Sequence, residues 1–170
     1  MRRTFQGRNA WAIFLYPAAA MPGRVVMDNS LYDRDFYAWA NQQAALLRAG
    51  RLAEADIANI AEEIESMGRS EKRELVSRLT ILLQHLLKWQ FQPGRQSVSW
   101  RLSIENTRLQ LEDHLKDNPS LKSQLPEAMQ SAYRRALNEA VAETGFARTT
   151  FPADCPYHFD QALDPDFWPE

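Results

Sequence analysis

Histidine and glutamate are among the residue types of this sequence that could bind a metal or move protons, and the histidines are the fewer. The sequence contains three of them, His85, His114 and His158. A di-iron site of the ferritin type needs a glutamate three residues before a helical histidine. Those positions hold Leu82, Leu111 and Cys155. No two histidines stand four residues apart, as a zinc protease requires. We therefore predict no metal site and no cofactor.

Paired carboxylates are the second candidate, because two such groups held close together push their pKa values apart and can divide acid and base roles. Glu62 and Glu63 are adjacent in a predicted helix over 52–67. An enzyme would combine one of them with His85 in a polar site between helices two, three and four, counted along the chain. The simpler interpretation is a solvated helix face with ion pairs to Arg69. We favour that interpretation and predict no catalytic residue, with the enzyme as the alternative.

A locally basic and aromatic segment covers residues 72–108. If two predicted helices present it on one surface, it could bind an anion or a nucleic-acid strand by phosphate contacts and stacking. Packing of the aromatic rings in the core is the competing interpretation and makes nucleic acid the less favoured ligand. The candidates for a small ligand-binding recess are His85, Lys88, Trp100 and Arg108. His85 borders the apolar arc of its helix, where a bond from its ring to a neighbouring helix would make it structural instead.

The overall composition argues against bulk electrostatic binding to nucleic acid or to an anionic membrane, because the formal net charge is −2. There is no glycine-rich phosphate loop and no nucleophile elbow. Cys155 is the only cysteine, so no intrachain disulfide can form and a reducing cytoplasm is the expected location. The apolar stretch 10–21 is interrupted by Pro17 and is too short to span a bilayer. We expect no membrane partner.

The elements that must position these residues are all helices. Apolar residues recur at three- and four-residue steps in five segments: 33–48, 52–67, 71–91, 98–117 and about 126–144. Gly50, Pro93 and Gly145 mark helix ends, and Ser97 is a predicted N-cap. We predict a break at Gly68 between the second and third helices. No strand pattern is present, so the fold class is all-α.

The helix predicted over 98–117 has two apolar faces. Val98, Leu102 and Leu109 group on one side. Trp100, Ile104, Leu111 and Leu115 group almost opposite. Both faces need cover, which favours a homodimer, although a central position in the monomer could also cover them.

The two ends of the chain are expected to differ. Residues 1–26 have no sustained amphipathic period and are expected to be a leader outside the fold, with an export signal as the alternative. Residues after Gly145 contain four prolines and many aromatic rings, which predicts an extended strap lying over the helices with a short helical turn near 159–163. Residues 27–170 would then form a single helical domain.

Four stretches of the sequence carry a family resemblance: LYDRDFYAWANQQAALLRAGRL, AEEIESMGRSEKREL, LLQHLLKWQFQP and DCPYHFDQALDPDFWPE. Together they resemble the bacterial and cyanobacterial domain-of-unknown-function family twenty-nine over about residues 30–170. The resemblance implies an α-helical bundle and no established activity, substrate or catalytic residue. We predict an antiparallel bundle of about five helices with an extended C-terminal strap, acting as a binding or assembly module without catalytic activity. Its partner would be a second copy or an unknown protein.

Overall fold

The computed structural model describes residues 31–170. This part of the chain contains six α-helices and no strand, which confirms the all-α fold class. It divides into two compact units, one ending at Asp56 and the other beginning at Ile57. The predicted leader, residues 1–26, lies outside the described residues. The single helical domain over residues 27–170 stays a prediction.

The first unit contains the short helix α1 (Leu31–Arg34) and the longer α2 (Phe36–Arg48). Asp35 caps α2, its side chain accepting a hydrogen bond of 2.9 Å from the Ala38 amide. The helix ends where Gly50 takes a positive φ of 69°, as a left-handed terminating residue must. Next come a 3₁₀ turn (Leu52–Glu54) and Asp56, whose amide donates to the Gln43 side chain at 2.8 Å.

The second unit is built on α3 (Ile57–Phe91), a single helix of 35 residues. Our predicted break at Gly68 is wrong. Glycine inside a helix costs only about 1 kcal/mol relative to alanine. Two ion pairs cross the position, because Arg69 contacts Glu62 at 2.7 Å and Glu65 at 3.3 Å. The second and third predicted helices are therefore one element, and its first residue is Ile57 rather than Leu52.

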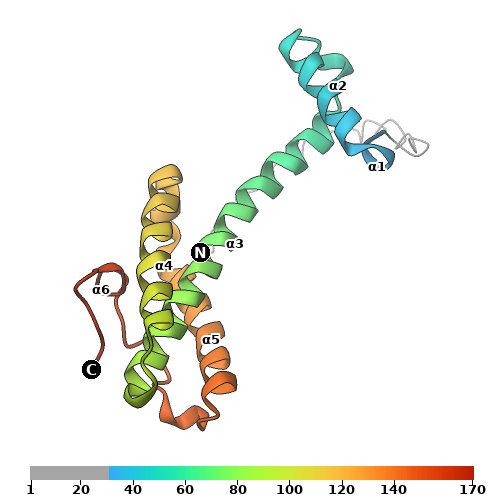
Figure 1. Cartoon of the computed structure of the whole chain (residues 1–170). Helices are drawn as coiled ribbons and strands as arrows, with labels where there is room; N and C mark the ends of the chain where they lie inside the picture. Colours follow the sequence, from blue (N-terminus) through green and yellow to red (C-terminus); the bar gives the residue numbers. More distant parts are fainter. Residues whose placement is uncertain (1–30) are drawn as a thin grey trace, which may run out of the picture. The chain divides into compact units, whose positions relative to one another are not determined.

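Two further helices, α4 (Val98–Asp117) and α5 (Leu125–Thr144), pack on the C-terminal part of α3. Arg78 of α3 donates to Gln110 of α4 at 2.8 Å, so α4 runs back along α3 after the Pro93–Arg95 turn. On the other helix, Lys72 lies 2.8 Å from Glu127. Because Lys88 further along α3 pairs with Glu143 further along α5, these two helices run in the same direction. The result is an up-down-up bundle (Figure 1).

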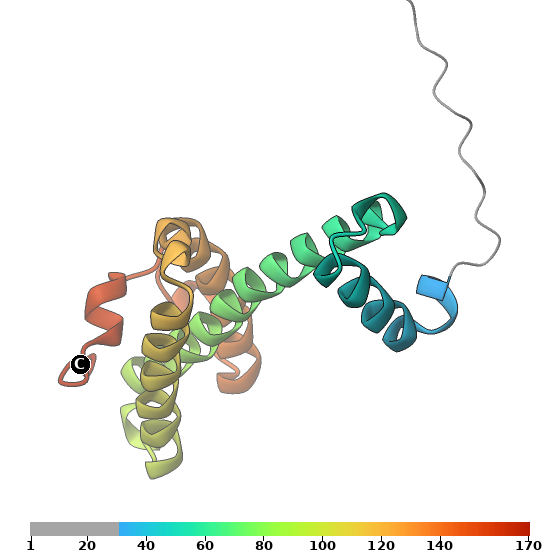
Figure 2. The ribbon, with the colours of Figure 1, turned by 90° about the horizontal axis from the view of Figure 1, so that it is seen from above.

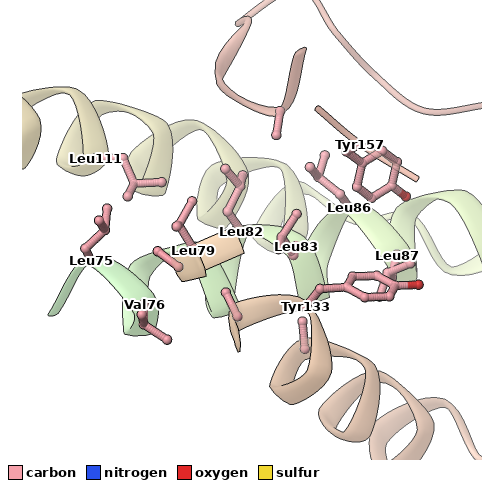
Figure 3. Packing of buried hydrophobic residues seen from close by; sticks show 14 of the residues in the cluster. Leu75, Val76, Leu79, Leu82, Leu83, Leu86, Leu87, Leu111, Tyr133 and Tyr157 are labelled. Atoms are coloured by element: carbon pink, nitrogen blue, oxygen red, sulfur yellow. The ribbon is translucent and has the colours of Figure 1, made fainter. Parts of the chain in front are cut away.

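The bundle core lies around the C-terminal part of α3, where α4, α5 and the C-terminal segment meet (Figure 3). The largest side chains with almost no solvent exposure are Leu75, Leu79, Leu82, Leu83, Leu86, Leu87, Ile104 and Leu111. The contribution of α5 includes small residues, with Ala128, Ala132, Ala136 and Ala140 fully buried. Small side chains allow the backbone of α5 to approach α3 closely.

The C-terminal segment, residues 145–170, is the predicted strap. It contains a 3₁₀ turn (Arg148–Thr150) and α6 (Phe159–Leu163), close to the turn expected near 159–163. Hydroxyl groups fix it to the bundle, because Tyr133 donates to the Pro152 carbonyl at 2.7 Å and Tyr157 donates to Gln90 at 2.8 Å. Phe151 and Tyr157 are each 5% exposed. The strap therefore completes the core rather than trailing from it.

Candidate functional site

The structure brings three of the four predicted recess residues to one region of α3 and the start of α4. Lys88 places its ammonium 4.5 Å from the centre of the Trp100 ring, a cation–π contact. The same ammonium forms an ion pair with Glu143 of α5. Its donated hydrogen bond holds the pKa of the Glu143 carboxyl below the usual range. The Lys88 charge is thus already balanced within the bundle.

His85 lies one turn before Lys88 and is half-buried. Its Nδ1 is 2.9 Å from the Ile81 carbonyl oxygen, so Nδ1 carries the proton and donates, because a carbonyl can only accept. The partner belongs to the same helix, not to a neighbouring one as the sequence-based alternative supposed. Burial lowers the pKa of His85, and the Lys88 charge adds to that effect, whereas the hydrogen bond to the Ile81 carbonyl and the charges of Glu143 and Glu139 oppose it. The net lowering favours the neutral imidazole.

Arg108, the fourth predicted recess residue, is directed toward the strap. It is 3% exposed. Its Nε, Nη1 and Nη2 donate to the carbonyls of Ala162, Pro165 and Phe167 at 2.9, 3.3 and 2.7 Å. The guanidinium also lies 5.3 Å from the Trp168 ring centre. All three nitrogens are thus engaged by the strap, and ligand binding by these four residues stays a prediction.

The alternative enzyme site needs a correction. It combined Glu62 or Glu63 with His85 across separate helices, but all three residues belong to the continuous α3. At 1.5 Å per residue, His85 lies more than about 30 Å along the helix axis from either carboxylate. Glu62 instead contacts Arg69 on the surface. These residues cannot share one substrate.

The aromatic rings of the 72–108 segment serve mainly in packing. Trp89 stacks on Trp168 of the strap at 4.7 Å between ring centres. Phe91 meets Phe151 at 5.1 Å. With Trp100 held under Lys88, no row of free rings lies along this segment for nucleic-acid bases to stack on. Nucleic-acid binding there stays a prediction that these contacts do not favour.

The remaining chemistry-bearing groups are dispersed. Burial raises the pKa of the Cys155 thiol, whose sulfur donates to the Tyr157 carbonyl at 3.4 Å, so it is a poor nucleophile at neutral pH. Across residues 31–170, no three histidine, cysteine, aspartate or glutamate side chains are grouped closely enough to hold a metal ion. None of the helices described there is both long and apolar enough to cross a membrane.

Two uncovered apolar rows stand out on the surface of the second unit. The first, which we call the α3 seam, consists of Ile57, Ile60, Ile64 and Met67, of which Ile60 is partly buried. Ile57, Ile64 and Met67 are 51%, 64% and 68% exposed. The second row lies on α4, where Val98, Leu102 and Leu109 are 75%, 50% and 60% exposed. The opposite face of α4, with Ile104 and Leu111 at 0%, is buried, so one of the two predicted apolar faces is covered within the unit.

A basic groove between α3 and α5 is lined by Arg73 and Arg135 among others. Arg73 belongs to the predicted basic segment 72–108, but no sequence signal indicated that Arg135 lies beside it. These residues are 62 positions apart, and only the parallel course of the two helices brings them together.

In the comparisons, a family model described as "Domain of unknown function DUF29" matches residues 31–168. No curated protein and no solved structure matches the chain.

Proposed function

The chain belongs to the DUF29 family, a domain of unknown function, and from its surface we propose a helical assembly module without catalytic activity that binds a second copy of itself. The observation that carries the proposal is the α3 seam. A reducing cytoplasm is the proposed compartment, because a single cysteine among 170 residues suits it.

The seam lies on a part of α3 that has little support from its own unit. All ten buried residues of this helix fall between Leu75 and Lys88. Figures 1 and 2 show the N-terminal part of α3 continuing beyond the region where α4 and α5 pack. An isolated helix of about 12–15 residues is only marginally stable in water. Burial of its apolar row against a partner would supply the missing stabilisation.

The spacing of the seam suits a second copy. Its residues follow one another at steps of three, four and three, which is the spacing of a coiled-coil seam. These steps read the same in both directions. A two-fold antiparallel pair therefore aligns position 60 with position 64 and position 57 with position 67, so each apolar side chain meets another. Such self-complementarity is what a symmetric dimer requires.

The size of the seam sets the expected affinity. A stable interface buries about 1,600 Å² in total, more than four short layers of apolar side chains provide. We therefore expect a reversible dimer with a dissociation constant in the micromolar range. The corresponding standard free energy of association is on the order of −8 kcal/mol.

The apolar row on α4 is the weaker candidate for self-association. Glu105 lies between Leu102 and Leu109 in this row and accepts a hydrogen bond from Arg101 at 2.8 Å.

Sedimentation velocity over a range of protein concentrations tests this function. The wild type should change from monomer to dimer as concentration rises. Ile64→Asp should remain monomeric, because a carboxylate in the seam would lose its hydration on dimerisation. Leu102→Asp, a matched substitution on α4 at a residue of similar exposure, should dimerise like the wild type.

Two results would contradict the proposal. One is a wild type that stays monomeric at several hundred micromolar. The other is a dimer that Leu102→Asp dissociates while Ile64→Asp does not. Far-ultraviolet circular dichroism of both variants verifies that each keeps its helices, which we expect because both positions are exposed.

A further inference from the structure

The groove between α3 and α5 is a surface cavity of the second unit with a volume of about 640 Å³. This volume lies within the range of small-molecule sites, about 300–1,000 Å³. Arg69, Lys72 and Arg73 line it from α3, and Arg135 lines it from α5. Four cationic side chains thus surround one hollow in a chain whose net charge is −2.

The charges of the groove are only partly neutralised. Lys72 contacts Glu127 at 2.8 Å, and Arg69 contacts Glu62 and Glu65. Within residues 31–170, neither Arg73 nor Arg135 has a carboxylate or other hydrogen-bond acceptor as a partner. These two guanidinium groups face the same cavity with their donors free for a ligand.

The other groups of the lining extend this donor set. Glu74 is its only carboxylate and is already paired with Arg78 at 2.7 Å. Ser70, Ser77 and Ser131 supply hydroxyl groups, and Val76 supplies an apolar surface. Apart from that occupied carboxylate, the polar side chains are cations or hydroxyls, a combination that suits an anion with several oxygen atoms.

We propose that the groove between α3 and α5 binds a small soluble anion that carries phosphate groups. Arginine is suited to this role because its planar fork donates two parallel hydrogen bonds to one phosphate. With Arg73 and Arg135 on different helices, the site favours two linked phosphates over one. This binding site is independent of the α3 seam and of the proposed self-association.

Isothermal titration calorimetry of the full chain with pyrophosphate tests the site, with sulfate at the same ionic strength as the comparison. Pyrophosphate should bind saturably and at least about tenfold more tightly than sulfate, because it can engage both guanidinium groups. Arg73→Gln/Arg135→Gln should weaken pyrophosphate binding at least about tenfold. Ser131→Asp should weaken it as well, because the new carboxylate would pair with the arginines.

The matched control is Arg95→Gln/Arg134→Gln, which removes the same total charge outside the groove. Both of these arginines are exposed, and Arg134 is the direct neighbour of Arg135 on α5. The control should bind pyrophosphate within about twofold of the wild type, because neither Arg95 nor Arg134 lines the groove and neither can donate a hydrogen bond to the bound anion. Equal weakening in the control and groove variants, no saturable binding by the wild type, or equal affinity for sulfate and pyrophosphate would each overturn the proposal.

Discussion

The two halves of α3 carry similar apolar periodicity but stand in different surroundings. In the C-terminal half, Leu79, Leu83 and Leu86 have no solvent exposure because α4, α5 and the strap surround them. In the N-terminal half, Ile64 and Met67 repeat the same spacing and are more than half exposed. Periodicity therefore identifies the apolar face of a helix, which is stabilised by burial. It does not tell whether that face is buried within the same unit or against another chain.

The largest expected effect contrasts one residue from each half. Leu83→Ala should lower the free energy of unfolding by about 3–5 kcal/mol, because it leaves a cavity in a closed core. Ile64→Ala, its matched control, should change that free energy by less than about 0.5 kcal/mol in dilute protein, because its side chain is mostly hydrated. Urea denaturation at a concentration where the wild type is monomeric measures both. Similar losses would show that the N-terminal half is covered even in the monomer.

The second effect concerns the strap that closes the C-terminal half. Arg108→Ala should lower the free energy of unfolding by about 2–4 kcal/mol, because three strap carbonyls lose a charged donor and the buried side chain leaves a gap. Arg101→Ala should cost less than about 1 kcal/mol, although Arg101 also lies near Trp168, because it is exposed. Denaturation together with limited proteolysis of the strap distinguishes the two. An Arg108→Ala protein with normal stability and a protected strap would refute this role.

A smaller effect is expected at His85. Its ring donates to the Ile81 carbonyl, which keeps its own helical hydrogen bond, so His85→Ala should cost less than about 1 kcal/mol at pH 7.5. Because the folded pKa of His85 is lowered, the unfolded chain binds the proton more readily. Wild-type stability should then fall as pH drops below about 6.5, and His85→Ala should reduce that slope. Denaturation at pH 7.5 and 5.5 measures the difference, and an unchanged slope would contradict it.

The smallest effect tests the continuity between the halves. Gly68→Ala should raise the free energy of unfolding by about 0.5–1 kcal/mol, because the position is helical and an added methyl group would meet open space. Gly145→Ala should lower it by a similar amount, since Gly145 takes a φ of 70° that alanine adopts poorly. Thermal denaturation of the two variants measures whether each substitution raises or lowers the free energy of unfolding. A destabilised Gly68→Ala protein would show that the helix bends or is closely packed there.

Much of the fold follows from local sequence signals. The Ser97 cap, the end at Gly145 and the double apolar face of α4 each depend on a few neighbouring residues, and the structure has all three. The predicted helix break at Gly68 is absent because the modest cost of glycine in a helix is offset by the continuity of α3 and by the ion pairs of Arg69. The separation of the chain at Asp56 had no comparable local signal.

The candidate site was less predictable because it depends on contacts between distant residues. Arg108 was a candidate for the ligand-binding recess, and only the docked strap shows what its guanidinium binds. Likewise, Arg73 belonged to the predicted basic segment 72–108, but only the parallel packing of α3 and α5 shows that Arg135 lines the same groove. Helical periodicity predicts which face of a helix each residue occupies. It does not predict which faces of different helices pack together.

The strap also has a consequence for the rates of folding and unfolding. The hydrogen bonds of Arg108 join residues 54 to 59 positions apart, and Gln90 donates to the carbonyl of Glu170 across 80 positions. The α3–α4 hairpin closes a far shorter loop, so it can form before the strap docks. Interactions made after the folding transition state mainly slow unfolding. The strap is therefore expected to slow the unfolding of the bundle more than it speeds its folding.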